Sequence, residues 1–249
     1  MPIFIFIVIH WYSSLFFQTF FMHRYAAHGM FTMSKFWEKI FYIGAFITQG
    51  SSFLSPRAYG IMHRMHHVYA DTEKDPHSPK YDDNLFKMMW KTKNTFNAIF
   101  KDKMTIDERF MKNLPDWFVF EKITNLWFVR TAWGLFYVAV YIYFDPAWWV
   151  YLFLPVNILM SPFHGAVINW FAHKYGYVSH KVGDTSKNLL PFDFLMLGES
   201  YHNNHHKFGS RANFGIKWHE FDPVYPFILL FDKLGIIRLK RNVDPLKPF

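Results

Sequence analysis

Long apolar stretches alternate with polar, basic ones along the chain. A helix that spans a membrane needs about 20 mostly apolar residues. Three stretches meet this requirement, at residues 3–22, 126–144 and 147–172. Pro155 and Pro162 are expected to kink the third stretch. The pattern predicts an all-α integral membrane protein with about three transmembrane helices.

A fourth stretch, 36–55, is apolar but includes Glu38 and Lys39. Only 34 residues separate His28 from His63, whereas two full passes through a membrane need roughly 40 residues. If both histidines lie at one membrane face, the stretch cannot cross and return. It is therefore expected to be an interfacial or re-entrant segment.

The net charge of +8 is unevenly distributed. Residues 1–22 and 131–173 contain no Lys or Arg. The positive-inside rule places the basic remainder on the cytoplasmic side, which predicts a multi-pass protein with cytosolic parts at 56–122 and 173–249. A basic surface there suits anionic membrane lipids and phosphate-bearing substrates. Nucleic acid is not expected as a partner, because no nucleic-acid-binding motif accompanies the charge.

Cysteine is absent from the sequence, and this limits the metal chemistry. Disulfides, thiolate zinc sites and iron–sulfur clusters are excluded, so a metal must be bound by His, Asp, Glu, Asn or water. Nine of the 14 histidines fall into four short clusters beside the apolar stretches. The clustered residues are His23, His28, His63, His66, His67, His173, His202, His205 and His206.

Helical spacing lets most of these clusters point at one place. Residues i, i+3 and i+4 share a helix face, so each H-x-x-H-H pattern can direct three imidazoles into one site. Asn169 and His173 are four apart and align in the same way. His23 and His28 are five apart, about 140° around a regular helix. Either the helix ends between them or they serve opposite sides of a two-metal centre.

The number of imidazoles favours two metal ions. One tetrahedral zinc ion takes four ligands, whereas nine imidazoles suit two ions with four or five each. Iron fits such a centre if the centre activates O₂, and Asn169 would then be a weak ligand or act through water. Of the other histidines, His10 and His164 are expected to be hydrogen-bonded structural residues. The rest, expected at the surface or in support of the ligands, are His77, His180 and His219.

Several motifs together resemble those of one enzyme family. They are H-R-Y-A-A-H at 23–28, H-R-M-H-H at 63–67, Asp75-Pro76-His77, N-W-F-A-H-K-Y-G-Y at 169–177, G-E-S-Y-H-N-N-H-H at 198–206 and Trp218-His219. In this order, from about residue 15 to residue 240, the chain is similar to the membrane-bound fatty acid desaturases, specifically the acyl-CoA (stearoyl-CoA type) branch. Family members usually have two membrane helices before the first histidine motif, and this chain has one.

The resemblance implies a single membrane desaturase domain over residues 1–249, with a cytosolic helical cap that holds a di-iron site. It implies that the nine clustered histidines bind two iron ions (Fe²⁺/Fe³⁺) and that Asn169 holds a metal-bound water. Gln49 matches a polar position in the family's acyl tunnel. Many Lys and Arg residues are candidates for binding the phosphates of the substrate, and Arg57 lies close to the second histidine cluster.

The resemblance also implies an activity: the O₂-dependent introduction of a cis double bond into a fatty acyl chain, carried by CoA (delta-9 type) or by a lipid. A separate ferredoxin or cytochrome b-type protein would supply electrons, because the 43 residues after His206 are too few for a fused haem domain. No side-chain base is expected to take part. A membrane di-iron lipid or alkane hydroxylase is the alternative, and a His-rich metal transporter is an alternative from another class.

Overall fold

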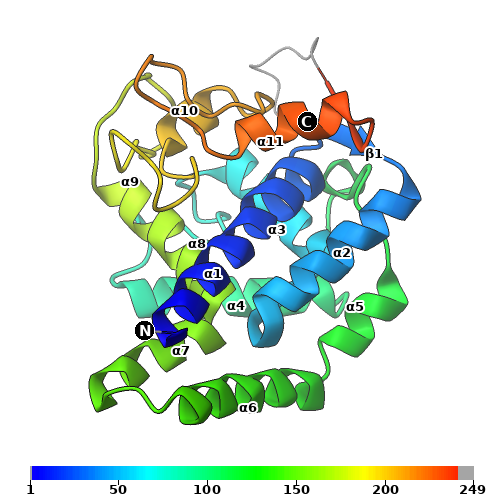
Figure 1. The fold of residues 1–249 in the computed structure, drawn as a ribbon. Helices are drawn as coiled ribbons and strands as arrows, with labels where there is room; N and C mark the ends of the chain where they lie inside the picture. The colour runs from blue at the N-terminus through cyan, green and yellow to red at the C-terminus, as the bar shows by residue number, and fades with distance from the viewer. Residues whose placement is uncertain (1, 241–249) are drawn as a thin grey trace.

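The first predicted span is one continuous helix. In the computed structural model, which describes residues 2–240, α1 (Pro2–Phe17) continues directly as the π-helix η1 (Gln18–Ala27) (Figure 1). This helix of 26 residues is long and apolar enough to cross a membrane, with a mean hydropathy of 1.6 over an 18-residue window. The helix runs past the predicted end at residue 22, because His23 and Arg24 are buried by the rest of the protein.

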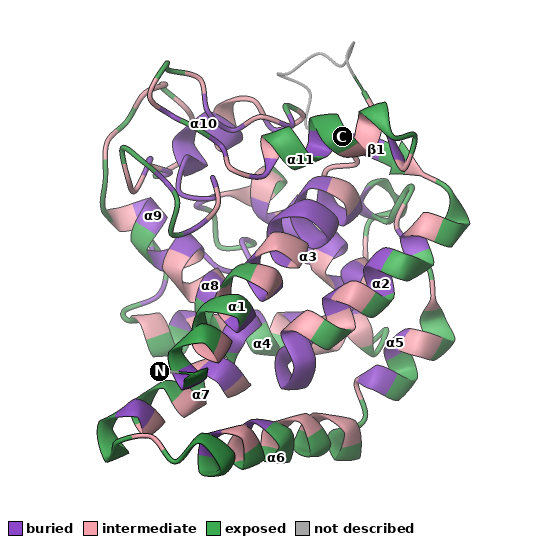
Figure 2. Ribbon diagram, in the orientation of Figure 1, coloured by how far each residue is buried: buried purple, intermediate pink, exposed green. Residues whose placement is uncertain are grey.

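The second predicted span is confirmed as a helix of sufficient length and apolarity, α6 (Trp127–Phe144). Only 11% of this helix is buried inside the protein, and most of its surface faces outward (Figure 2). The helix ends at Asp145, which has a left-handed conformation with φ 39°. Pro146 follows and cannot continue the helix.

The third predicted span, 147–172, is not one kinked helix but a broken one. Its parts are η4 (Trp148–Phe153), α7 (Leu154–Ile158), α8 (Met160–Ala166), η5 (Val167–Phe171) and α9 (Ala172–Lys174). The two halves meet at Leu159 and are bent by 83°. Pro155 and Pro162 each lie in the first turn of a helix, where a missing N–H costs nothing. The described residues thus contain two candidate spans, or three if the bent pair counts as one.

The stretch predicted to be interfacial, 36–55, forms the amphipathic helix α2 (Lys35–Gln49) and a short turn, η2 (Gly50–Ser52). Ser34 caps α2 by accepting a hydrogen bond from the Trp37 backbone N–H. At 15 residues, α2 is shorter than a spanning helix. It presents exposed Phe36 and Ile47 on one side, while its other side packs against α1. Its position at the interface stays a prediction.

The polar regions fold as short helices around η1. They contain α3 (Pro56–Tyr69), α4 (Leu85–Phe100), η3 (Glu108–Met111), α5 (Phe118–Thr124), α10 (His202–Lys207) and α11 (Tyr225–Lys233), with β1 (Phe31–Met33) antiparallel to β2 (Ile237–Leu239). A core of aromatic side chains joins η1 and α2 to α11. Figure 1 shows α10 and α11 at the end of the molecule opposite α6. The last part of the predicted cytosolic region 173–249, residues 241–249, lies outside the described residues.

Candidate metal centre

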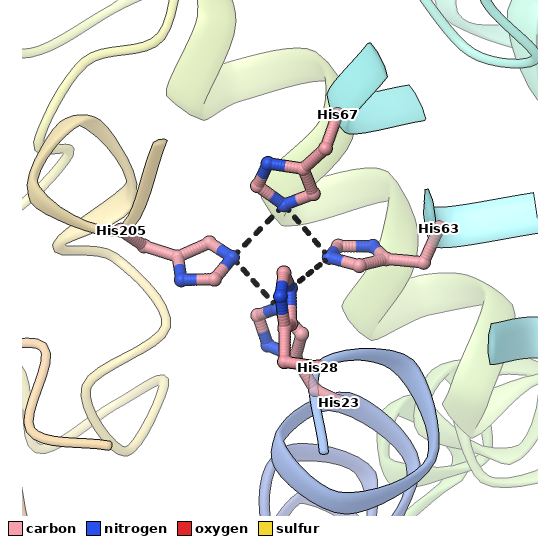
Figure 3. Close-up of side chains that lie close together, drawn as sticks. All are labelled: His23, His28, His63, His67 and His205. Atoms are coloured by element: carbon pink, nitrogen blue, oxygen red, sulfur yellow. Dashed lines mark hydrogen bonds between the residues drawn. The ribbon is translucent and has the colours of Figure 1, made fainter. Parts of the chain in front are cut away.

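Five of the predicted ligands converge from three separate helices. They form group 1, which consists of His23, His28, His63, His67 and His205 (Figure 3). Their inward ring nitrogens all lie within 4.8 Å of one another. The Nε2 atom of His205 lies 3.0 Å from that of His23 and 3.0 Å from that of His67. Nitrogen lone pairs that face one point at this spacing suit a single metal ion.

The other four predicted histidines form a second group. Group 2 consists of His66, His173, His202 and His206, again with ligand atoms within 4.8 Å of one another. α3 and α10 each contribute to both groups, because adjacent histidines on a helix point to opposite sides of the same face. The nine histidines are thus divided five and four, as expected for two metal ions.

The π-helical geometry of η1 explains how His23 and His28 reach the same group. The His28 backbone N–H donates to the His23 carbonyl oxygen at 3.1 Å, a bond between residues five apart that defines a π-helix. A π-helix has more residues per turn than an α-helix, so residues five apart lie closer to one face and the 140° offset of a regular helix does not apply. The alternative that these two histidines serve opposite sides of a two-metal centre is wrong. The helix does end at Ala27, between them.

Four histidines of group 1 are neutral, which is the protonation state that binds a metal. Burial, followed by the neighbouring imidazoles, lowers the pKa of His28, His63, His67 and His205 well below the usual value. Burial with the same repulsion lowers the pKa of two group 2 ligands, His202 and His206. These rings are therefore neutral near pH 7, and each keeps a lone pair.

Carboxylates behind the ligands fix which ring nitrogen faces inward. The Nδ1 atoms of His66 and His206 lie 3.0 Å and 2.8 Å from Asp75 and Asp184, and Nδ1 of His23 lies 2.7 Å from Glu199. With the proton on Nδ1, donating to the carboxylate, Nε2 is left as the ligand atom. The sequence motifs include Asp75 and Glu199 without assigning them a role. Asp184 was missed, because its spacing from His206 has no helical regularity.

Two buried nitrogens test whether a metal fits. Nε2 of His66 and Nε2 of His206 have no hydrogen-bond partner among the described residues, although both are shielded from solvent. Burial opposes the charged form of His66, yet the nearby Asp75, Asp184 and Asp71 raise its pKa. A buried cation between these nitrogens would bind both lone pairs and balance the negative charge of the nearby carboxylates. The residues of group 2 thus fit a metal ion.

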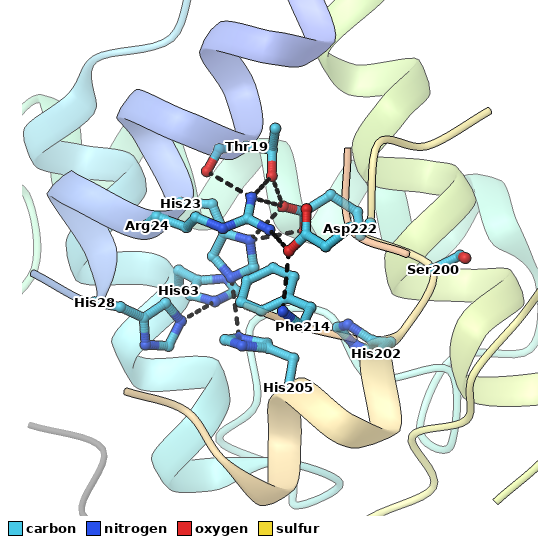
Figure 4. A network of polar contacts seen from close by, with 12 residues as sticks. Thr19, His23, Arg24, His28, His63, Ser200, His202, His205, Phe214 and Asp222 are labelled. Atoms are coloured by element: carbon cyan, nitrogen blue, oxygen red, sulfur yellow. Dashed lines mark hydrogen bonds and ion pairs between the residues drawn. The ribbon is translucent and has the colours of Figure 1, made fainter. Parts of the chain in front are cut away.

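A buried ion-pair network holds η1 against the C-terminal loop (Figure 4). The Arg24 side chain is fully buried and donates through Nη2 to Asp222 at 2.6 Å and through Nε to the Ala212 carbonyl oxygen at 3.0 Å. Its Nη1 atom also contacts Thr19 and lies 3.5 Å from Glu199. Because Glu199 also binds His23, this network fixes the position of a group 1 ligand.

The remaining predicted site residues belong to neither histidine group. Asn169 is half-buried on η5, one turn before His173. The buried amide of Gln49 donates to Gln18 at 3.1 Å, and Arg57 forms a 3.4 Å ion pair with Asp102. Their roles in holding water, lining a tunnel and binding phosphates stay predictions.

The histidines outside the two groups behave differently from one another. His10 is hydrogen-bonded to Asn157, as expected for a structural residue. His164 is buried against Trp11, but its ring nitrogens have no hydrogen-bond partner among the described residues. His77 is buried beside His66, with ring centroids 4.4 Å apart, so a surface position for it is wrong.

Gly60 is expected to set the spacing between the two helices that carry group 1. A Cβ atom at Gly60 would lie 2.9 Å from the Ala26 carbonyl oxygen, so α3 would have to move away from η1. Gly60→Ala is expected to destabilise the protein by about 1–3 kcal/mol, as overpacking usually does, and to lower the amount of metal that the chain binds. Melting temperature and bound metal per chain measure both effects. Gly134→Ala on α6 has free space and is the control; equal behaviour of the two variants would contradict the prediction.

Asp75→Asn is expected to weaken metal binding without removing a ligand. The change replaces the buried carboxylate that accepts a hydrogen bond from Nδ1 of His66. Loss of such an outer partner typically lowers metal affinity or activity by about 10–100-fold. A chelator competition titration with iron measures the affinity, with exposed Asp83→Asn as the control. An unchanged affinity would show that Asp75 does not support the ligand.

Comparison with known proteins agrees with this geometry. A model of the family described as fatty acid desaturase matches residues 1–233. The Delta-9 desaturase-like 5 protein of Arabidopsis thaliana is 31% identical over 230 residues, which are 88% of this chain and 70% of the relative. The sn-1 stearoyl-lipid 9-desaturase of Synechocystis sp. is 31% identical over 223 residues, 87% of this chain and 64% of the relative. The chain thus spans about two thirds of the length of these relatives.

Proposed function

We propose a function that proceeds from one premise: this chain belongs to the fatty acid desaturase family. It is accordingly an oxidoreductase of lipid metabolism that forms unsaturated fatty acids. The proposal is that it introduces a cis double bond into a fatty acyl chain, using O₂ and a centre of two iron ions. The observation that carries it is the division of nine imidazoles into adjacent groups of five and four.

The position of the double bond and the carrier of the acyl chain are finer parts of the proposal. Several relatives are named delta-9 or 9-desaturases, which favours the ninth carbon. The histidine motifs resemble the acyl-CoA branch, whereas relatives are named stearoyl-lipid and acyl-lipid desaturases. Feeding stearoyl-CoA and a stearoyl phospholipid separately, each labelled in the acyl chain, distinguishes the two carriers.

The residues of the centre perform specific parts of this reaction. One O₂, two electrons and two protons are consumed with each –CH₂–CH₂– unit, giving –CH=CH– and two waters. Two bound iron ions would supply O₂ reduction and removal of the two hydrogen atoms. The nine imidazoles hold the ions, and Asp75, Asp184 and Glu199 keep the protons on Nδ1. The protein that surrounds the centre excludes water and positions the acyl chain.

The proposed location is a multi-pass membrane protein whose centre faces the cytoplasm. The first span ends in the group 1 ligands, and α10, which contributes to both groups, lies at the end of the molecule opposite α6. Lys and Arg occur only in residues 23–130 and 174–249, the segments that carry eight of the nine grouped histidines. The positive-inside rule favours the cytoplasmic side for such segments.

Expression of the chain in membranes with an electron donor tests the function. Two irons per chain and a new monounsaturated fatty acid, identified by mass spectrometry, are expected. Fewer than two irons would overturn the di-iron centre. A hydroxylated product would instead support a membrane hydroxylase, and metal transport without oxidation of fatty acids would support a transporter.

A further inference from the structure

An exposed loop, residues 178–187, covers group 2 on its outer side. Exposed Thr185 places its Oγ1 atom 3.2 Å from Nδ1 of His173. The next residue back, Asp184, binds Nδ1 of His206 at 2.8 Å and is 11% exposed. Two ligands of group 2 are therefore one side chain away from the protein surface.

The loop is held in place by buried side chains. The Asn203 amide oxygen accepts hydrogen bonds from the backbone N–H groups of Ser179 and His180 at 2.9 Å and 2.8 Å. Its amide nitrogen donates to the Ser186 carbonyl oxygen at 3.1 Å. Because Asn203 follows the ligand His202 in α10, the loop and the ligands form one preorganised unit.

A pocket lined by two lysines and Asp184 opens beside this loop. Its volume is about 420 Å³, and its lining includes His173, His180, Lys181 and Lys187. Burial, followed by the positive charges of Lys207 and Lys217, lowers the pKa of His180. Two lysines thus line a pocket that reaches a group 2 ligand, and two more act on the His180 beside it, where Glu220 opposes them. This set of Lys181, Lys187, Lys207 and Lys217 is called the lysine rim.

Within the described part of the chain, no comparable path leads from the protein surface to group 1 at the carboxylate that binds His23. Glu199, which binds His23, is buried and is enclosed by Thr19 and Arg24. A protein that docks at the surface comes nearer to the ligands at the loop than at this buried network. Electron transfer falls steeply with distance, so the loop is the favoured route.

We propose that the loop 178–187 and the lysine rim form the docking surface for an acidic protein that donates one electron at a time. The electrons reach the centre through His173 and His206. This inference rests on the proposed function, whose balance requires two electrons for each O₂, and two donor molecules are each oxidised once. Complementary charge favours rapid encounter of such partners.

The pocket suits a protein donor better than the anionic head of an acyl carrier. In a delta-9 reaction, a run of methylenes separates the carrier from the reacting carbons. The pocket lies directly against a group 2 ligand, so a carrier bound there would leave no room for that run. Binding of a phosphate-bearing carrier is nevertheless a distinct outcome of the test.

The test is charge reversal on the lysine rim in the full-length protein in membranes. Lys181→Glu with Lys217→Glu changes two exposed residues that contact no ligand. The donor is a reduced, acidic plant-type [2Fe–2S] ferredoxin, and unsaturated product is measured as its concentration varies. The ferredoxin concentration at half-maximal rate is expected to rise at least about tenfold, because rim charges act mainly on association. Single-turnover desaturation driven by dithionite is expected to stay unchanged.

Lys103→Glu with Lys112→Glu is the matched control, because both residues are exposed and lie outside the rim. Its half-maximal ferredoxin concentration is expected to stay within about twofold of wild type. Equal effects of the two pairs, or none from the rim pair, would overturn the docking surface while leaving the proposed function intact. A raised KM for the acyl substrate alone would assign the rim to the carrier instead. No product from wild type with either reductant would overturn the proposed function itself.

Discussion

His205→Ala is expected to abolish desaturation and to remove one of two iron ions. The His205 ring is buried in group 1, between His23 and His67, at 3.0 Å from each. No neighbouring side chain can replace it, because His63 on α3 and His28 at the end of η1 already point at the same place. The loss of turnover is expected to exceed about 100-fold, which is the upper range for removal of a mere outer partner. Product formation and iron per chain measure the two effects.

Two further measurements separate ligand loss from misfolding. His66→Ala removes a group 2 ligand, so it is expected to stop turnover while the iron of group 1 is retained. Added imidazole is expected to restore part of the activity of His205→Ala, because a free ring can occupy the space. If His205→Ala kept full activity without two irons, His205 would not be a residue of the centre. Loss of both irons together with the folded far-ultraviolet spectrum would indicate unfolding instead.

The gathering of the nine histidines was predictable in part because it depends on local spacing. His63, His66 and His67 are on one helical face whatever the rest of the chain does, and the expectation of two metal ions followed from counting the imidazoles. Which of the two alternatives holds for His23 and His28 was not predictable, because a π-helix is distinguished only by its hydrogen bonds between residues five apart. A regular helix was the wrong reference for that segment.

The parts that failed or were missed depend on distant contacts. Asp184 reaches His206 from an irregular loop, and Thr185 reaches His173 in the same way. The apolar pattern at 147–172 is the same for a straight span and for the two segments bent by 83°. The prolines indicated a disturbance there, but only tertiary packing determines whether a helix kinks or breaks.

The second large effect is expected at Arg24, the fully buried cation behind group 1. Arg24→Met keeps an apolar stem but leaves Asp222 and Glu199 buried without their guanidinium partner. Breaking a buried pair in this way typically destabilises a protein by about 3–5 kcal/mol. Asp222 has no exposed side-chain surface, so solvent cannot replace the lost charge. The melting temperature is expected to fall by several degrees, with loss of iron from group 1 at a lower temperature than in wild type.

A double-mutant cycle shows whether the charge, rather than the shape, is responsible. Adding Asp222→Asn to Arg24→Met removes one of the stranded carboxylates and is expected to recover part of the melting temperature. Arg24→Lys is expected to be intermediate, because lysine keeps the charge but cannot bind Asp222 and the Ala212 carbonyl oxygen together. Lys87→Met, in an exposed pair with Asp83, is the control and should leave the melting temperature unchanged. If Arg24→Met matched that control, the network would contribute nothing to fixing His23, and the position of group 1 would have to depend on the packing of α3 against η1 alone.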